Sequence, residues 1–383
     1  MRNPLRRLLS LLVGVAFLAA GCGGETTSET DPAERPNVVI IFTDDQGYGD
    51  VGVYGAEGFE TPNLDAMAAE GTRFTDFYVG SPVCSPSRAA LLTGSYPPRV
   101  GIPDVLFPRV TQGLNPEETT IADMLGAEGY ATQAVGKWHL GDHPRFLPTS
   151  NGFDHYFGMP YSNDMSPVEA HNPNGERYPP IPLLEDTTVV EREPDQRLLT
   201  RRYTERAVSF IEETAGEQPF FLYLAHTMPH VPLFASDQFR GSTEQGIYGD
   251  VIREIDWSVG QVLDALEAQG VDENTLVLFA TDNGPWLSYG NHGGSNGPLQ
   301  EGKFTVFDGG QRVPFIARWP GEVPAGRTSD AVVTSLDILP SLAQMTMASL
   351  PERLIDGVDV SPVLLGEAGE EFQRPPFFFY DSR

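Results

Sequence analysis

The sequence predicts an α/β fold in which helices flank a large, mostly parallel central sheet. Two observations lead to this fold class. Several short, continuous apolar runs are typical of strands buried on both faces, and stretches with helical periodicity separate them. We expect the buried strands at residues 37–43 (NVVIIFT), 131–135 (ATQAV), 218–225 (QPFFLYLA) and 275–281 (TLVLFAT).

The helices are expected at residues 62–70, 117–128 and 250–269. In the last of these, Val251, Ile255, Val259 and Val262 recur every three or four residues, which places them on one face of a helix. A chain of 383 residues is long enough for one large domain or two. No internal repeat is visible.

Polar side chains follow each predicted strand. In open α/β sheets the ligand binds at the carboxyl ends of the strands, so these side chains predict a functional site at that edge. They are Asp44 and Asp45 after the first strand, Lys137 and His139 after the second, His226 and His230 after the third, and Asp282 and Asn283 after the fourth.

The two acidic pairs predict a metal site. Asp44, Asp45, Asp282 and Asn283 offer three carboxylates and one amide carbonyl. Such hard oxygen ligands suit Ca²⁺ or Mg²⁺ and do not suit zinc. Either pair alone would more often cap a helix or start a turn. Two pairs at matching strand ends favour a divalent cation.

The basic residues predict an anion site. Lys137 and His139 lie in GKWHLG, and His230 and Lys303 come from other loops. Together they would form a cluster for an oxyanion, whereas His226, nearer its strand, can equally be a core histidine. The net charge is −28. This charge speaks against a nucleic-acid partner, because phosphate binding needs clustered Lys and Arg.

The N-terminus predicts export. Arg2, Arg6 and Arg7 precede an apolar run at residues 8–20, which is typical of a signal peptide and too short to span a membrane. Residues 18–22 (LAAGC) resemble a bacterial lipobox, so we expect a signal over residues 1–22, lipidation of Cys22 and a flexible tether over residues 23–35. The protein would be a lipoprotein of the periplasm or cell surface, anchored to the membrane by lipid only. The alternative is an ordinary cleaved signal.

Cys84 would then have no partner for an internal disulfide, since the chain has only two cysteines. It lies where a Ser/Pro-rich turn enters a helix-forming stretch. A thiol at a helix N-terminus has a lowered pKa and can act as a nucleophile, which suggests a cysteine hydrolase. No local His–Asn or His–Asp pair supports this hypothesis, and a buried structural thiol is the alternative.

The stretch CSPSRAALLTG at residues 84–94 resembles the signature of the type I sulfatases, within the alkaline phosphatase superfamily. Further motifs in family order are NVVIIFTDDQGYGD, GKWHLG, GFDHYFGMPYSND, HTMPHVP, TDNGP and GKFTVFDGGQRVP. The resemblance covers residues 37–383 and implies a catalytic domain over residues 36–372. It implies hydrolysis of aryl or carbohydrate sulfate monoesters, after a formylglycine-generating enzyme has oxidised Cys84 to Cα-formylglycine.

The resemblance also implies a role for each site residue. The hydrated formylglycine would be the nucleophile, and Arg88 would stabilise it. His139 would serve the step that regenerates the aldehyde, and His230 or Lys303 would protonate the leaving alcohol. The metal ligands would be Asp44, Asp45, Asp282 and Asn283, binding calcium or alternatively magnesium, and the sulfate-binding residues would be Lys137, Ser162, His230 and Lys303.

Two features depart from the family pattern. Asp308 stands in DGGQRVP where family members usually have Glu. Residues 373–383, with a strand-like run at 375–381 (PPFFFYD), would begin a smaller antiparallel C-terminal domain that is largely missing. Two rival functions remain. One is a phosphomonoester or phosphonate hydrolase of the same superfamily, and the other is a catalytically silent lipoprotein that binds sulfated glycans.

Overall fold

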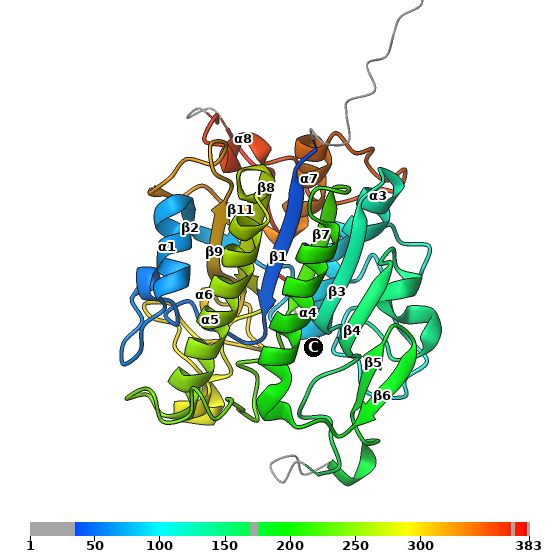
Figure 1. Cartoon of the computed structure of the whole chain (residues 1–383), viewed down its shortest axis with the longest axis vertical. Coiled ribbons are helices and arrows are strands. Elements are labelled where there is room, and N and C mark those ends of the chain that lie inside the picture. Colours follow the sequence, from blue (N-terminus) through cyan, green and yellow to red (C-terminus); the bar gives the residue numbers. More distant parts are fainter. Residues whose placement is uncertain (1–34, 169–174, 369–371, 381–383) are drawn as a thin grey trace, which may run out of the picture. The chain divides into compact units, whose positions relative to one another are not determined.

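The computed structural model describes residues 35–168, 175–368 and 372–380 (Figure 1). The predicted signal peptide, the lipidation of Cys22 and nearly all of the tether lie outside the described residues. Within the described part, none of the helices combines the length and the apolar character needed to cross a bilayer.

An eleven-stranded sheet forms the centre of the described chain, with the order β10-β2-β9-β8-β1-β7-β3-β4-β5-β6 and β11 paired with β2. Its middle is parallel throughout. Four of these central strands carry the continuous apolar runs expected from the sequence, and they are β8 (Thr275–Thr281), β1 (Asn37–Thr43), β7 (Phe220–Ala225) and β3 (Ala131–Lys137). The fifth, β4 (His155–Met159), was not expected.

The margins of the sheet are mixed. β9 (Arg312–Arg318) runs antiparallel to both β8 and β2 (Thr72–Tyr78). β10 (Arg327–Ser329) and β11 (Val333–Thr334) pair with β2 in parallel. At the other margin, β5 (Pro182–Glu185) and β6 (Thr188–Arg192) form an antiparallel hairpin beside β4. Since six strand pairings are parallel and four antiparallel, the prediction of a mostly parallel sheet in an α/β fold is confirmed.

Helices cover both faces of the sheet (Figure 1). Alternate residues of β1 point to opposite faces: Val39 and Ile41 belong to one core cluster, and Val38, Ile40 and Phe42 to the other. The first cluster includes residues of α1 (Pro62–Glu70), α4 (Leu199–Thr214) and α5 (Ile247–Ala268). The second includes residues of α2 (Cys84–Thr93), α3 (Ile121–Ala127), α7 (Ile338–Thr346) and α8 (Ser361–Leu364).

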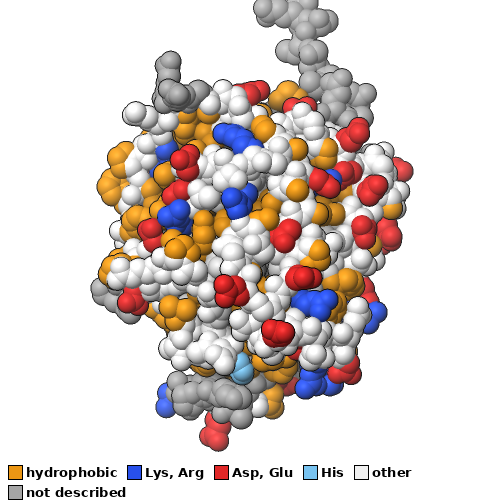
Figure 2. Space-filling model, turned by 90° about the vertical axis from the view of Figure 1, so that its left-hand side faces the viewer, with side chains coloured by type: hydrophobic (Ala, Val, Ile, Leu, Met, Phe, Trp, Pro, Cys, Tyr) orange, Lys and Arg blue, Asp and Glu red, His pale blue; other side chains and the backbone are white. Residues whose placement is uncertain are grey.

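Short helical turns complete the described elements. They are α6 (Asp308–Gln311), η2 (Gly52–Tyr54), η3 (Pro144–Phe146), η4 (Pro148–Ser150), η5 (Gly175–Arg177), η6 (Gln196–Leu198), η7 (Asp272–Asn274), η8 (Leu287–His292) and η9 (Ser335–Asp337). On the face drawn in Figure 2, acidic and basic side chains are interspersed with hydrophobic ones.

Two expected elements differ from the structure more than the others do, whose bounds shift by at most three residues. The helix expected at 117–128 begins only at Ile121, because Thr120 and Asp123 form a capping box at its start. The strand-like run at 375–381 forms no strand over its described part, so that expectation is wrong. Its two prolines offer no N–H for a ladder, and Phe377 packs against Tyr78 and Tyr96 through ring contacts instead.

Candidate active site

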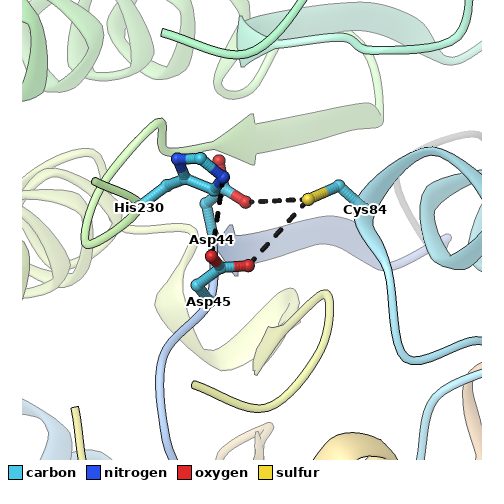
Figure 3. Close-up of side chains that lie close together, drawn as sticks. All are labelled: Asp44, Asp45, Cys84 and His230. Atoms are coloured by element: carbon cyan, nitrogen blue, oxygen red, sulfur yellow. Dashed lines mark hydrogen bonds and ion pairs between the residues drawn. The ribbon is translucent and has the colours of Figure 1, made fainter. Parts of the chain in front are cut away.

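The sheet brings the predicted residues together at the carboxyl ends of its parallel strands. β1 and β8 are neighbours with Thr43 opposite Thr281, so the acidic pairs that follow them start side by side. Lys137 is the last residue of β3, which neighbours β7. Figure 3 shows how Asp44, Asp45, Cys84 and His230 converge. Eleven predicted site residues of the described chain are buried, and the most exposed of them is Lys303 at 7%. They are Asp44, Asp45, Cys84, Arg88, Lys137, His139, Ser162, His230, Asp282, Asn283 and Lys303.

Asp45 is the most highly bonded carboxylate of the site. Lys303 Nζ lies 2.7 Å from each of its oxygens, and Asn283 Nδ2 donates to Oδ1 at 2.7 Å. His230 Nε2 is 3.5 Å from Oδ2. The residue has a φ of +65°, in the left-handed region. Such backbone strain concentrates at functional sites, where the surrounding structure holds it in place.

Asp44 is surrounded by positive charge. Lys137 Nζ donates to its Oδ2 at 2.5 Å, and Arg88 Nη2 lies 3.7 Å from Oδ1. Burial alone would raise the pKa of this carboxyl group, but the charges of Lys137, His230 and Arg88 outweigh burial and hold the pKa below its ordinary value. Asp44 is therefore an ionised carboxylate inside the protein.

Arg88 connects helix α2 to Asp282, one of the predicted metal ligands. Its Nε and Nη2 donate to Asp282 Oδ2 at 3.0 and 2.8 Å, and its Nη1 donates to the Lys137 carbonyl at 2.9 Å. Asp282 Oδ1 in turn accepts from the backbone N–H of Asp45 at 3.1 Å. The guanidinium is fully buried, so these bonds fix the relative positions of three strand ends.

Cys84 is the first residue of α2, and its thiol lies in the middle of the charged cluster. The Sγ atom is 3.5 Å from Asp44 Oδ1 and 3.3 Å from Lys303 Nζ. Burial, and then the charge of Asp282, raise the pKa of this thiol well above its ordinary value. The expectation that a helix N-terminus lowers the pKa of Cys84 is therefore wrong, and the hypothesis of a cysteine hydrolase loses its support.

The residues present fit a hard divalent cation. One ligand atom from each of Asp44, Asp45, Cys84 and His230 can be chosen so that all four lie within 4.8 Å of one another. Asn283 Oδ1 is buried beside them and has no hydrogen-bond donor within the described chain. Clustered carboxylate oxygens and an unsatisfied amide carbonyl are the donor set that calcium and magnesium prefer.

His139 is held as a neutral base. Its Nε2 lies 2.9 Å from the carbonyl oxygen of Leu106, so Nε2 carries the proton and donates it. Nδ1 is buried and has no partner within the described residues. Burial and the nearby charges of Lys137 and Arg88 lower the pKa of the imidazole well below its ordinary value. The imidazole is therefore neutral, and Nδ1 presents an unprotonated nitrogen to the cluster.

The remaining predicted residues divide into two groups. Ser162 lies at the cluster, with its Oγ 3.3 Å from Lys137 Nζ. His226 does not: its Nε2 lies 3.2 Å from Ser258 Oγ inside the core, as the alternative interpretation of this histidine required. Asp308, at the position of the family's Glu, forms an ion pair with Arg312 at 3.5 Å.

Two residues that hold the loops and the lysine of the site in place, Asp50 and Trp286, were not predicted from the sequence. Asp50 accepts hydrogen bonds from Gly47 N, Ser295 N and Tyr248 Oη at 2.8, 3.0 and 2.6 Å, and so ties the loop after β1 to a second loop. Burial raises the pKa of Asp50 to about 6. Trp286 lies beneath Lys303, whose Nζ is 4.8 Å from its ring centroid. In the sequence, only proximity to a motif pointed to these two residues: Asp50 lies just after DDQG, and Trp286 lies just after TDNG.

Comparison with known proteins identifies the family. The model of the sulfatase family matches residues 36–348. The chain belongs to the sulfatase family. It is 43% identical to human arylsulfatase A, over 100% of this chain and 75% of that protein. It is 41% identical to the N-acetylgalactosamine-6-sulfatase of the dog, Canis lupus familiaris, over 97% of this chain and 72% of that protein. This sulfatase is accordingly a sulfuric ester hydrolase, as predicted.

Solved structures agree with this assignment. The structure of Ps i-CgsB in complex with k-i-k-neocarrahexaose matches with a TM-score of 0.79 and 34% identity, over 87% of this chain and 77% of that one. The PsFucS1 sulfatase from Pseudoalteromonas sp. matches with a TM-score of 0.79 and 29% identity, over 87% and 72% of the two chains. A phosphonate monoester hydrolase from Silicibacter pomeroyi, at 20% identity, shares the fold alone, with a TM-score of 0.67 over 88% and 78% of the two chains.

Proposed function

We propose that this sulfatase hydrolyses sulfate monoesters of carbohydrates or aryl alcohols with a formylglycine made from Cys84 and a bound calcium ion. The observation that carries this proposal is the position of residue 84. Its side chain is buried between an ammonium group, Lys303 Nζ at 3.3 Å, and a carboxylate, Asp44 Oδ1 at 3.5 Å. A plain thiol with a raised pKa is a poor nucleophile there, whereas the hydrate of an aldehyde would supply an oxygen nucleophile.

The cation would be held by Asp44, Asp45, Asp282 and Asn283. Asn283 Oδ1 is the buried acceptor that lacks a donor, and the three carboxylates supply the negative charge. When bound, the ion would act as a Lewis acid next to residue 84. Thermal unfolding of the full chain in a chelator should therefore occur at a lower temperature, and added Ca²⁺ should restore the midpoint. An unchanged midpoint would contradict the metal assignment.

The substrate's sulfate group would bind to Lys137, Ser162, Lys303 and His230. Lys137 and Lys303 are buried cations fixed by Asp44 and Asp45, so they need no reorganisation when negative charge develops on the sulfate oxygens. Arg88, held by Asp282 and the Lys137 carbonyl, would stabilise the nucleophile at residue 84, one helical turn away.

Two histidines would handle the protons. His230 Nδ1 faces the carbonyl of its neighbour Val231 at 2.5 Å, which leaves Nε2 directed at the cluster. Lys303 has both oxygens of Asp45 as acceptors, so His230 would be the less constrained donor to the leaving alcohol. It would donate from Nε2 as an imidazolium, because Nδ1 already uses its proton toward the Val231 carbonyl. On the other side His139 Nδ1 is the free acceptor that would take a proton from residue 84.

The experiment compares 4-nitrophenyl sulfate with 4-nitrophenyl phosphate as substrates of the full chain, produced together with a formylglycine-generating enzyme. We expect sulfate-ester turnover to exceed phosphate-ester turnover, and Cys84→Ala to abolish both. Faster phosphate release would favour the phosphomonoesterase alternative. Activity that survives Cys84→Ala would exclude residue 84 as the nucleophile, and no turnover by the converted chain would favour the catalytically silent glycan-binding alternative.

We also propose export and lipidation of Cys22, as the LAAGC stretch predicts. The mature protein would be tethered to a bacterial membrane at the periplasm or cell surface. Its N-terminal peptide should begin at Cys22 and carry acyl chains, which mass spectrometry would detect. An unmodified N-terminal peptide that begins beyond residue 22 would indicate an ordinary cleaved signal.

A further inference from the structure

We propose that Trp286 and Tyr289 form an aromatic binding site for the pyranose ring that carries the scissile sulfate, with Tyr289 stacking on that ring. The proposal rests on the proposed function, because it takes the sulfate group to lie among Lys137, Lys303 and His230. It names the substrate class and adds two substrate-binding residues that the motif resemblance does not include.

Trp286 adjoins the cations directly. The Nζ atom of Lys303 lies 4.8 Å from the centroid of its ring, and the imidazole of His230 lies 5.7 Å from it, edge to face. Phe304 supports the indole from another side at 5.2 Å. The indole therefore packs against the two groups that would contact the sulfate and its bridging oxygen, at a position fixed by ring contacts.

Tyr289 extends this aromatic surface outward. It lies in η8 (Leu287–His292), and its ring is 4.7 Å from that of Trp286 at an angle of 76°. Its side chain is 39% exposed, whereas Lys303 is only 7% exposed. Burial, and then the charge of Asp164, raise the pKa of Tyr289, whereas the charge of Lys303 lowers it.

The aromatic side chains that lead from His230 through Trp286 to Tyr289 indicate where the alcohol part of the substrate binds. A sulfate ester must place its sulfur beside residue 84 in the buried cluster, and its organic part must then extend toward solvent. His230, Trp286 and Tyr289 are successive ring neighbours that lead from buried to exposed. A ring attached to the sulfate would meet the face of Tyr289, and stacking would remove apolar surface of both from water.

Asp164 favours a sugar over a simple aryl group. It is a partly exposed residue of the loop that contains Ser162, two residues after the serine whose Oγ lies 3.3 Å from Lys137 Nζ. A carboxylate accepts hydrogen bonds from ring hydroxyls. A pyranose presents both an apolar C–H face for Tyr289 and hydroxyls for Asp164, whereas an unsubstituted aryl ring offers only the face.

The test measures binding by calorimetry to the full chain carrying Cys84→Ala, so that no ligand is turned over. The ligands are inorganic sulfate, N-acetylgalactosamine 6-sulfate and 4-nitrophenyl sulfate. Tyr289→Ala should weaken the sugar sulfate about tenfold relative to inorganic sulfate, because stacking is lost. Tyr289→Phe keeps the ring and should stay within about twofold. His292→Ala removes an exposed ring from the other end of η8 and is the matched control, also expected within about twofold.

The outcomes separate this proposal from the proposed function. If the starting chain binds no inorganic sulfate, the proposed function fails, and the aromatic site fails with it. If sulfate binds but Tyr289→Ala leaves the ratio of the two affinities unchanged, the aromatic site alone is refuted. Asp164→Asn should lower the affinity for the sugar sulfate about fivefold relative to 4-nitrophenyl sulfate. An unchanged ratio would overturn the assignment of a pyranose.

Discussion

The arrangement of the site depends on the side chain of Arg88 more than on any other single residue. It is fully buried and makes two bonds to Asp282 Oδ2 and one to the Lys137 carbonyl. A lysine could keep the charge but could not reproduce this planar set of donors. At the residue scale the site is therefore specified by the number and direction of bonds, and not only by charge.

We therefore expect Arg88→Lys to lower the free energy of unfolding by about 2–4 kcal/mol, because a buried charge loses partners. It should also reduce kcat/KM at least about a hundredfold. Urea unfolding and initial rates measure the two effects. Arg99→Lys is the matched control, since Arg99 also makes two bonds to one carboxylate, that of Asp356, but lies at the surface. It should cost less than about 1 kcal/mol, and equal losses for both variants would contradict this account.

At the scale of elements, β3 positions Lys137 by passing unusually close to its neighbours. Gly136 has a φ of +104°, and a Cβ there would lie 1.8 Å from the carbonyl oxygen of Ala225 in β7. In β4, a Cβ on Gly158 would lie 1.8 Å from the carbonyl oxygen of Gly136. The close approach of three strands therefore requires glycine immediately before Lys137.

Gly136→Ala should destabilise the protein by about 3 kcal/mol, from backbone strain plus the displacement of β7. It should also lower activity, because Lys137 moves with the strand. Gly129→Ala is the control, because Gly129 also has a positive φ, +86°, but a Cβ there would meet no atom within 4 Å. We expect about 1–2 kcal/mol from strain alone and nearly normal activity. Chemical denaturation would measure both, and equal losses would refute the steric explanation.

The packing of β7 against α5 gives stability a defined pH dependence. His226 is buried beside Ser258 of α5, and burial lowers the pKa of its imidazole from 6.5 to about 3. Because the unfolded chain binds this proton more tightly, His226 contributes stability above pH 6.5 that is lost as the pH falls toward 3. The loss should be on the order of 4 kcal/mol between pH 6.5 and 3.5.

His226→Gln keeps an acceptor for the Ser258 hydroxyl but does not titrate. Its unfolding free energy should therefore fall less steeply than that of the natural protein over this pH range. Denaturant melts at several pH values would measure the difference. Parallel curves for the two proteins would show that His226 does not titrate as its burial requires.

The fold could largely be predicted from the sequence. Polar groups that follow continuous apolar strands predicted the acidic pairs and Lys137, whereas Ser162 was implied only by the motif resemblance. β1, β8 and α1 have the bounds that their residues indicated. β2 and β9 were missed because polar residues or a proline interrupt their apolar residues. Such short interrupted runs do not show whether a segment is a strand or part of a helix. Asp50 and Trp286 were missed because their roles depend on loops brought together only in three dimensions.

At the scale of the whole molecule, the enclosure of residue 84 dictates when it can be modified. Cys84 is 2% exposed, and every residue of α2 is buried between the sheet and the helices around it. A maturing enzyme could reach this turn only before the layers close. Under the proposed function, the chain would therefore have to be converted while it is still unfolded at α2, and it would then fold around the product.

We accordingly expect iodoacetamide to leave Cys84 unmodified in the folded, unconverted chain and to alkylate it in strong urea. The difference in rate should be at least about a hundredfold, since reaction of the native protein requires opening of the structure. The peptide of residues 74–88, released by trypsin, reports this site separately from Cys22. Rapid alkylation in native buffer would contradict the enclosed position of residue 84.

The most direct test of the account is the mass of that same peptide of residues 74–88 from the active protein. Sulfatase activity should rise in proportion to the fraction of peptide in which the thiol of Cys84 has been replaced by an aldehyde. Protein made without a formylglycine-generating enzyme should carry the thiol and show no turnover. Full activity in a sample whose peptide contains only unmodified Cys84 would contradict the account.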